Sequence, residues 1–239
     1  MLRIVAPLAV FLIALPLAAL AFKEGPYPNV TGGFGEQSCH LCHIDNPINA
    51  PGGSVALDGV PATFVPGQTY PITVTITRDG LRRGGFEVAA RFAAGRQKGR
   101  QAGSWRPLDA RVQLIPGAVD KVLTFVQHNQ IGSRTATPGA NTWTVEWTAP
   151  SPAAGPVQFN VAANASNNDD SPLGDYIYLK MVRSVPERSG GGAGLMGQVG
   201  SDSSRLAYPP SFDPISRTYL VITTRPRTCV HSDTTLPTT

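Results

Sequence analysis

Three residues near the start of the chain, Cys39, Cys42 and His43, form the pattern Cys-x-x-Cys-His. Two cysteines at this spacing present their sulfurs on one side of a turn, close enough to bond to the two vinyl groups of one haem. The histidine that follows is then placed to bind the iron from one face. The motif therefore predicts one covalently attached haem c, held by Cys39 and Cys42, with His43 as the proximal iron ligand.

Three other chemistries use the same residue types. A thioredoxin-like redox pair needs a βαβ context and a helix that begins at the first cysteine, and the flanking Gly, Asn and Pro residues do not supply it. A zinc site could draw on Cys39, His40, Cys42 and His43, but adjacent side chains do not converge on one ion without strain. A disulfide between Cys39 and Cys42 is the third alternative, although such short loops are strained.

A haem bound at His43 has a second axial position, whose ligand sets the reduction potential and reactivity. The candidates are His40, His128, His231, Met181 and Met196. His128 ends the run VLTFVQH before a turn, so its side chain could face a haem at a sheet edge, and we take it as the distal candidate. A locally hydrogen-bonded or solvent-exposed histidine is the alternative. Met181 alternates with Ile177 and Leu179 and is expected in the core.

Two further polar groups have more than one interpretation. A basic cluster could steer an acidic redox partner protein or form a solvated loop. Its members are Arg91, Arg96, Lys98, Arg100, Arg106 and Arg111. A second group carries oxygens of the kind that bind calcium. It lacks the EF-hand pattern, and Asx-rich turns form without metal, so calcium is the less favoured interpretation. Its members are Asn164, Asn167, Asp169, Asp170 and Asp175.

The first 21 residues place one Arg before an apolar run that ends in Ala-Leu-Ala. This is the pattern of a cleaved signal peptide, so residues 1–21 predict export to the periplasm or cell exterior, with Phe22 as the mature start. An uncleaved membrane anchor is disfavoured by Pro16 and by the abrupt polar change at Lys23. After cleavage no transmembrane span is expected. The formal net charge of +4, which falls to +3 without Arg3, is too small for a nucleic-acid binder.

The rest of the chain divides by composition. Residues 22–56 are rich in Gly, Pro and Asn and predict a loop segment that carries the haem motif, whereas residues 57–183 predict a β-sandwich. Apolar residues alternate with a period of two in 70–76, 86–92, 143–147, 157–163 and 176–181, and a further run lies in 120–128. With no amphipathic helix, these strands predict an all-β, immunoglobulin-like antiparallel sandwich, with a closed barrel as the alternative. Trp143 and Trp147 share one strand face and are expected in the core.

Residues 184–239 have the glycine and serine content of a flexible linker followed by a disordered tail. The apolar run from Tyr219 to Ile222 is far too short to span a bilayer. Cys229 in this tail could form an intermolecular disulfide or remain an unpaired thiol.

Several stretches together resemble bacterial choice-of-anchor V proteins, whose sandwich is similar to the Reeler domain of reelin-type proteins. They are GPYPNVTGGFGEQSCHLCHIDNPINAPGG, VPATFVPGQTYPITVTI, GGFEVAARF, WTVEWTAP and GPVQFNVAANASNNDDSPLGDYIY, within residues 25–180. The resemblance implies that the Cys-x-x-Cys-His segment precedes the sandwich and that a variable anchor follows it. The tail here departs from that plan, because it holds no recognisable anchor. Reeler-like domains also occur beside cytochrome b561 modules in ferric reductases, which is an analogy only.

These observations favour an exported mono-haem c-type cytochrome that passes single electrons to a redox partner protein. The alternative is a cell-surface binding or adhesion module with a structural haem or a Cys39–Cys42 disulfide, and a third hypothesis is a haem enzyme or gas sensor with an open iron position. No Ser/His/Asp, paired-carboxylate or phosphate-loop constellation is present, so an electron carrier or binding protein is favoured over an enzyme.

Overall fold

The computed structural model describes residues 23–187. The predicted signal peptide, most of the linker and the whole tail, with Met196, Cys229 and His231, lie outside the described residues. No helix within 23–187 has the length and apolar character needed to cross a bilayer.

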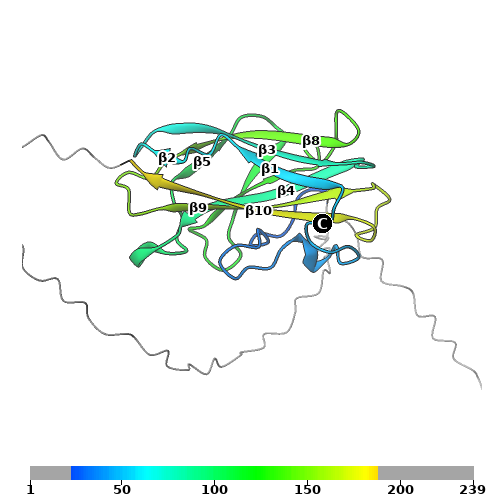
Figure 1. Ribbon diagram of the computed structural model, residues 1–239, viewed down its shortest axis with the longest axis horizontal. Helices are drawn as coiled ribbons and strands as arrows, with labels where there is room; N and C mark the ends of the chain where they lie inside the picture. Colours follow the sequence, from blue (N-terminus) through cyan, green and yellow to red (C-terminus); the bar gives the residue numbers. More distant parts are fainter. Residues whose placement is uncertain (1–22, 188–239) are drawn as a thin grey trace, which may run out of the picture. The chain divides into compact units, whose positions relative to one another are not determined.

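Two β-sheets stack face to face in this part of the chain (Figure 1). The four-stranded sheet has the order β1 (Gly53–Asp58), β3 (Thr69–Arg78), β8 (Ala140–Thr148) and β5 (Ser104–Pro107). The six-stranded sheet has the order β2 (Thr63–Phe64), β10 (Tyr176–Pro186), β9 (Val157–Ser166), β4 (Arg83–Phe92), β7 (Thr124–His128) and β6 (Val112–Pro116). All pairs are antiparallel except the short β2–β10 pair. The predicted all-β sandwich is confirmed, and the sheets do not close into a barrel.

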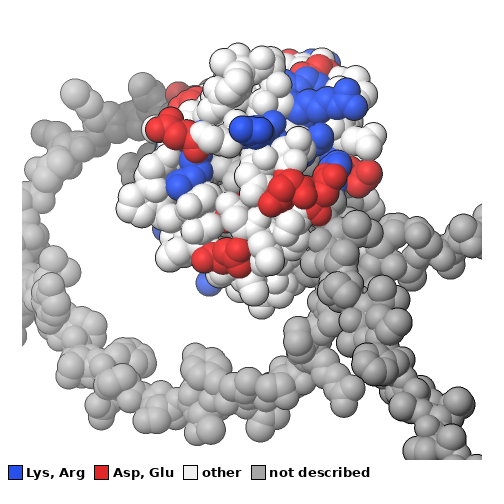
Figure 2. Space-filling view, turned by 90° about the vertical axis from the view of Figure 1, so that its right-hand side faces the viewer, with Lys and Arg blue, Asp and Glu red and all other residues white. Residues whose placement is uncertain are grey.

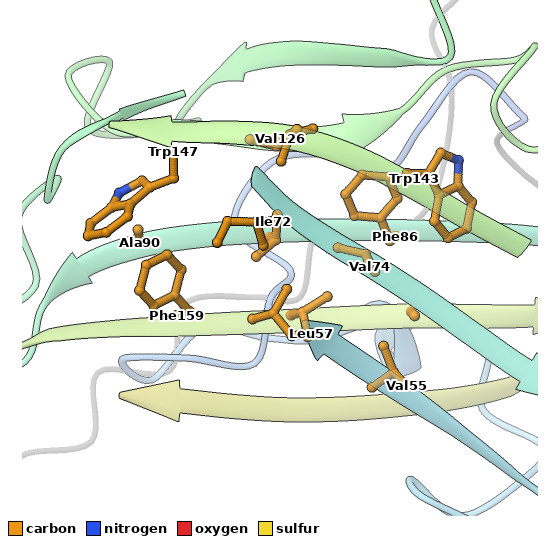
Figure 3. Packing of buried hydrophobic residues seen from close by; sticks show 14 of the residues in the cluster. Val55, Leu57, Ile72, Val74, Phe86, Ala90, Val126, Trp143, Trp147 and Phe159 are labelled. Carbon is orange, nitrogen blue, oxygen red and sulfur yellow. The ribbon is translucent and has the colours of Figure 1, made fainter. Parts of the chain in front are cut away.

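The core follows directly from the alternation of residues in the sequence. In β3 the side chains of Ile72, Val74 and Ile76 are fully buried between the sheets, while the threonines between them face away. Trp143 and Trp147 point inward from β8, as predicted, and Figure 3 shows Trp147 beside Phe159 of β9. The Nε1–H of Trp147 donates to the Ala102 carbonyl oxygen and that of Trp143 to the Gly132 carbonyl oxygen, each at 2.9 Å, so neither indole is buried without a partner.

The segment before β1 is ordered by the six-stranded sheet rather than by its own secondary structure. Residues 23–50, here called the N-terminal strap, run along the outer face of that sheet, on the side away from β1, β3 and β8 (Figure 1). The backbone N–H of Val30 donates to Glu87 Oε1 at 2.8 Å. A Cβ atom on Gly33 would lie 2.3 Å from Cγ of Asn160, so only glycine permits this approach of the strap to β9.

Met181 is not the core residue that its alternation predicts, because 51% of its surface is exposed. Ile177, Leu179 and Met181 of β10 face outward, toward the strap. The strap reaches Ile177, whose carbonyl oxygen accepts from the Asn49 N–H at 2.9 Å. The side chain of Ile177 is fully buried. The alternation exists, but the face assignment was wrong, because Tyr178 and not Met181 enters the core between the sheets. Met181 lies on the outer face of β10, beyond the part that the strap covers.

Candidate functional site

The Cys-x-x-Cys-His residues lie in the strap, around the 3₁₀ turn η1 (Cys39–Leu41). Ser38 caps this turn, and its Oγ accepts from the His40 N–H at 3.3 Å. Cys39 is a free thiol, whereas Cys42 is disulfide-bonded. The two cysteines are therefore not bonded to each other, and the alternative of a Cys39–Cys42 disulfide is wrong.

The predicted haem c is also wrong. Attachment needs two reduced sulfurs that both bond to the porphyrin, and the sulfur of Cys42 is already part of a disulfide. Within residues 23–187, no group of three or more His, Cys, Asp or Glu side chains is arranged to hold a metal ion. The four candidate zinc ligands, Cys39, His40, Cys42 and His43, are therefore not arranged as a zinc site either.

Cys39 lies close to the buried carboxyl of Glu87. Burial, and after it the charge of Glu87, raises the pKa of the Cys39 thiol to about 12, although part of the residue's surface remains open. Such a thiol stays protonated at neutral pH and is a poor nucleophile. Cysteine-based catalysis at this position is therefore not supported.

His43 is positioned by the far end of the sandwich. Its Nδ1 lies 2.9 Å from Oδ2 of the buried Asp175, which precedes β10. The same Oδ2 accepts from Asn164 Nδ2 at 3.1 Å, and Asp175 Oδ1 accepts from the Asn167 N–H at 3.3 Å. The imidazole is thus part of a polar network that fixes the loop between β9 and β10.

The residues that follow His43 contact the same loop. Asp45 Oδ2 accepts from the Gly174 N–H at 2.8 Å, and Asn46 Nδ2 donates to the Asp175 carbonyl oxygen at 2.9 Å. Three of the four residues in the stretch His-Ile-Asp-Asn therefore hold residues 174 and 175. The motif region acts here as a brace for the β9–β10 loop.

Most of the oxygens proposed for calcium have protein partners in or beside the same loop, whereas the buried Asn164 Oδ1 has none among the described residues. Asp175 bonds to His43 and Asn164, Asp170 forms an ion pair with Lys23, and the Asp169 side chain accepts from Asn167 Nδ2 and from the Ser171 N–H. These contacts build Asx turns, and no metal-holding cluster exists in the described part of the chain. The calcium interpretation is not supported.

His128 lies at the end of β7, where its ring packs near Phe86 and Trp143. Its Nδ1 accepts the Phe86 N–H at 3.0 Å, so the imidazole takes the place of a backbone partner between β4 and β7. Burial lowers the pKa of His128 to about 4, which keeps the ring neutral. The structure therefore buries His128 as a neutral, hydrogen-bonded side chain between β4 and β7. Its prediction as a distal haem ligand is corrected together with the haem.

The predicted basic cluster is divided among separate environments. Arg91 is buried under the strap in an ion pair with Glu36, and Arg106 pairs with Glu146 on the other sheet. Arg111 donates to Asn141 Oδ1 at 2.7 Å and to the Thr142 carbonyl oxygen at 2.9 Å. Only Arg96, Lys98 and Arg100, around η2 (Gly95–Gln97), remain together as an exposed basic loop.

A cavity of about 240 Å³ opens where the β3–β4 hairpin meets the braced β9–β10 loop. The hairpin and the loop together supply its lining, which consists of Arg78, Asp79, Gly80, Leu81, Ala165, Ser166, Asn167, Gly174 and Tyr176. The β3–β4 hairpin and the β9–β10 loop, which supply this lining, lie at the right-hand end of the sandwich in Figure 1. Figure 2 shows that end with both Lys and Arg side chains and Asp and Glu side chains at its surface, in places next to one another.

Arg78 is the best-held charged group of this cavity. Its Nη1 donates to the Pro51 carbonyl oxygen at 3.0 Å and to the Tyr178 hydroxyl at 2.6 Å. Its Cζ atom lies 3.1 Å from the centre of the Tyr176 ring, so the guanidinium stacks on the aromatic face. Among the described residues, Nε and Nη2 have no hydrogen-bond partner, and neither does the Asp79 carboxylate.

Sequence reasoning missed this cavity and the covered Glu87. The signal for Arg78 and Asp79 was present, since Arg78-Asp79-Gly80 ends an alternating strand with a hairpin dipeptide. No local signal distinguishes Glu87 from an ordinary outward-facing strand residue.

No protein family and no curated protein matches this chain. Among solved structures, the human F-spondin reeler domain has 18% identity and a TM-score of 0.38, over 59% of this chain and 93% of that one. A cohesin module from a Clostridium perfringens ATCC13124 family 33 glycoside hydrolase has 11% identity and a TM-score of 0.37, over 56% and 98%. AvmM, which catalyses macrocyclization in alchivemycin A biosynthesis, has 14% identity and a TM-score of 0.37, over 62% and 94%. At these TM-scores the likenesses carry no weight for function.

Proposed function

We propose that this protein is an exported ligand-binding module, in which the Cys-x-x-Cys-His region is structural. Electron transfer is not proposed, because it depended on a haem that the cysteine chemistry contradicts. The function proposed is therefore the binding alternative, now without haem and without a Cys39–Cys42 bond.

Export is supported by two independent features. Residues 1–21 have the signal-peptide pattern, and a disulfide at Cys42 forms and persists in oxidising compartments such as the periplasm or the cell exterior. The resemblance of residues 25–180 to choice-of-anchor V proteins suits a surface location as well. Membership of that family stays a prediction.

The observation that carries the binding proposal is the rigid rim of the cavity at the hairpin end. The β9–β10 loop is held by His43, Asp45 and Asn46, and the hairpin is held by Arg78. Side-chain polar groups that face the cavity without partners, on elements that cannot easily move, are what a preorganised ligand site requires.

Nuclear magnetic resonance of the ¹⁵N-labelled mature protein tests this proposal. Addition of a panel of sugars, amino acids and nucleotides should shift the amide signals of Gly80 and Gly174, which line the cavity. The amide of Gly117, which lies in the β6–β7 connection, serves as the internal control. A panel in which no compound shifts Gly80 or Gly174 would contradict the binding function.

A second measurement distinguishes the binding proposal from the cytochrome hypothesis. Expression with cytochrome c maturation machinery should give a colourless protein whose mass shows no added porphyrin. A red product that keeps its haem through denaturation would contradict the proposal and restore the cytochrome hypothesis.

A further inference from the structure

We propose that the cavity between the β3–β4 hairpin and the β9–β10 loop binds one carboxylate-bearing sugar unit, a uronate, through the free edge of Arg78. This inference rests on the proposed binding function and adds the ligand class. It concerns residues that no motif in the sequence assigns to a site.

The first step is the geometry of the guanidinium. Arg78 uses Nη1 for Pro51 and Tyr178, which leaves the Nε–Nη2 edge as a pair of parallel donors. This edge matches the two oxygens of a carboxylate, and bidentate pairs of this kind are the strong charge-assisted hydrogen bonds. Because the opposite edge is tied and the plane is stacked on Tyr176, little side-chain entropy remains to be lost on binding.

The second step concerns the neighbouring acid. Asp79 follows Arg78 in the hairpin, lines the same cavity, and has no hydrogen-bond partner within residues 23–187. A carboxylate of this kind accepts hydrogen bonds from hydroxyl groups but repels a simple anion such as sulfate. The ligand that suits both residues carries one carboxylate together with hydroxyl groups.

The third step uses size and net charge. A volume of about 240 Å³ lies below the usual range for drug-sized ligands, about 300–1,000 Å³, so it suits a single small unit. The hairpin carries Arg78, Arg82 and Arg83 against one acid, Asp79, so its own net charge is +2 and favours a ligand with net negative charge over a zwitterion. On the facing β9–β10 loop, Asp170 is paired with Lys23 and Asp169 accepts hydrogen bonds within the loop. A uronate is a singly charged anion with hydroxyls, whereas an amino acid has no net charge.

Binding of glucuronate to the full mature protein, measured by calorimetry and by the Gly80 and Gly174 amide shifts, tests the inference. Glucuronate should bind at least about tenfold more tightly than glucose, since a hydrogen-bonded charge pair contributes at this scale. Arg78→Lys keeps the charge but loses the bidentate edge, so it should weaken glucuronate binding about tenfold. The matched control, Arg96→Lys on the exposed η2 loop, should leave binding within about twofold.

Several outcomes would overturn the inference. If glucose binds as tightly as glucuronate, the carboxylate has no role. If sulfate binds as tightly, the site is a simple anion site. If glycine binds more tightly, the ligand class is an amino acid and not a sugar acid. In each of these cases the binding module would still stand. Failure of glucuronate to bind overturns the ligand class, whereas failure of every compound in the wider panel overturns the module itself.

The wild-type protein alone also gives a decision if Arg78→Lys does not fold. Glucuronate in which the carboxylate is methyl-esterified keeps the hydroxyls and the ring but loses the charge. It should bind at least about tenfold more weakly than glucuronate. Undiminished binding of the ester would overturn the inference.

Discussion

The outer faces of the two sheets carry polar side chains in the same alternating pattern, yet their environments are opposite. On the four-stranded sheet, Thr75 and Thr142 are hydrogen-bonded across β3 and β8 at 3.2 Å and remain partly in contact with solvent. On the six-stranded sheet, Glu87 faces outward in the same manner and is completely buried by the strap. An alternating pattern therefore identifies the face of a strand but not what covers it.

The covered face has a cost that the open face does not. Three buried oxygens under or beside the strap have no hydrogen-bond partner among the described residues, namely Glu87 Oε2, Gln127 Oε1 and Asn164 Oδ1. Unpaired buried polar groups are destabilising by about 1–3 kcal/mol each. Strap contacts such as the Glu36–Arg91 ion pair must offset this, which makes the strap sensitive to single changes.

The largest expected effect comes from the ion pair under the strap. Arg91→Ala leaves the nearly buried Glu36 carboxylate without its charge partner, which should lower the free energy of unfolding by about 3–5 kcal/mol. The matched control is Arg106→Ala, which breaks the exposed pair with Glu146 on the open face and should cost less than about 1 kcal/mol. Urea denaturation measures both, and equal losses would remove the distinction between the faces.

The next effect is a pH dependence set by Glu87. Burial raises the pKa of its carboxyl to about 8 from an ordinary 4.5, so its contribution is fully present below pH 4.5 and is lost as the pH rises through 8. Between pH 5 and pH 7 this should lower the free energy of unfolding by about 2–3 kcal/mol. Glu87→Gln should remove that loss; a variant that keeps the wild-type pH profile would show that this carboxyl does not titrate as described.

A slightly smaller effect of opposite sign comes from His128. Burial lowers its pKa to about 4 from an ordinary 6.5, so its contribution is present above pH 6.5 and is lost as the pH falls through 4. Between pH 7 and pH 5 the loss should be about 2 kcal/mol. His128→Asn keeps an acceptor for the Phe86 N–H and should abolish it. The contributions of Glu87 and His128 change with pH in opposite directions. The free energy of unfolding of the wild-type protein should therefore change little between pH 5 and pH 7.

The smallest effect is expected on the open face. Thr75→Ala removes one hydroxyl pair that water can replace, so the free energy of unfolding should fall by about 0.5 kcal/mol. Thermal unfolding followed by circular dichroism is sufficient to compare it with the wild type. A loss as large as that of Arg91→Ala would mean that the threonine face is covered by something outside residues 23–187.

The sequence was sufficient for the sandwich but not for its site. Long alternating runs such as 70–76 and 157–163 predict β3 and β9, because burial of one face imposes a period of two. Four strands were not predicted, namely β1, β2, β5 and β6. The strands β2 and β5 have only two and four residues, which leaves no period to detect, and β1 begins inside segment 22–56, which was expected to be a loop.

The interpretation of the motif failed for a different physical reason. Local spacing places Cys39, Cys42 and His43 on one turn, and that geometry suits haem attachment and a bracing turn equally well. Which of these two roles the turn has depends on its contacts with Asp175 and Gly174. These residues are distant in sequence and meet the strap only in the folded chain. The hairpin site has the same character, because Tyr176 meets Arg78 only after β3 and β10 are brought together.

The protonated state of Cys39 also bears on disulfide fidelity. A reactive thiolate three residues from a disulfide-bonded cysteine would favour thiol–disulfide exchange, in which the thiolate attacks one sulfur of the disulfide and the other sulfur leaves. With the pKa of Cys39 raised to about 12, only a minute fraction of this sulfur is ionised at neutral pH. Burial of Cys39 under the strap thus keeps the one free thiol within residues 23–187 from exchanging with the disulfide of Cys42.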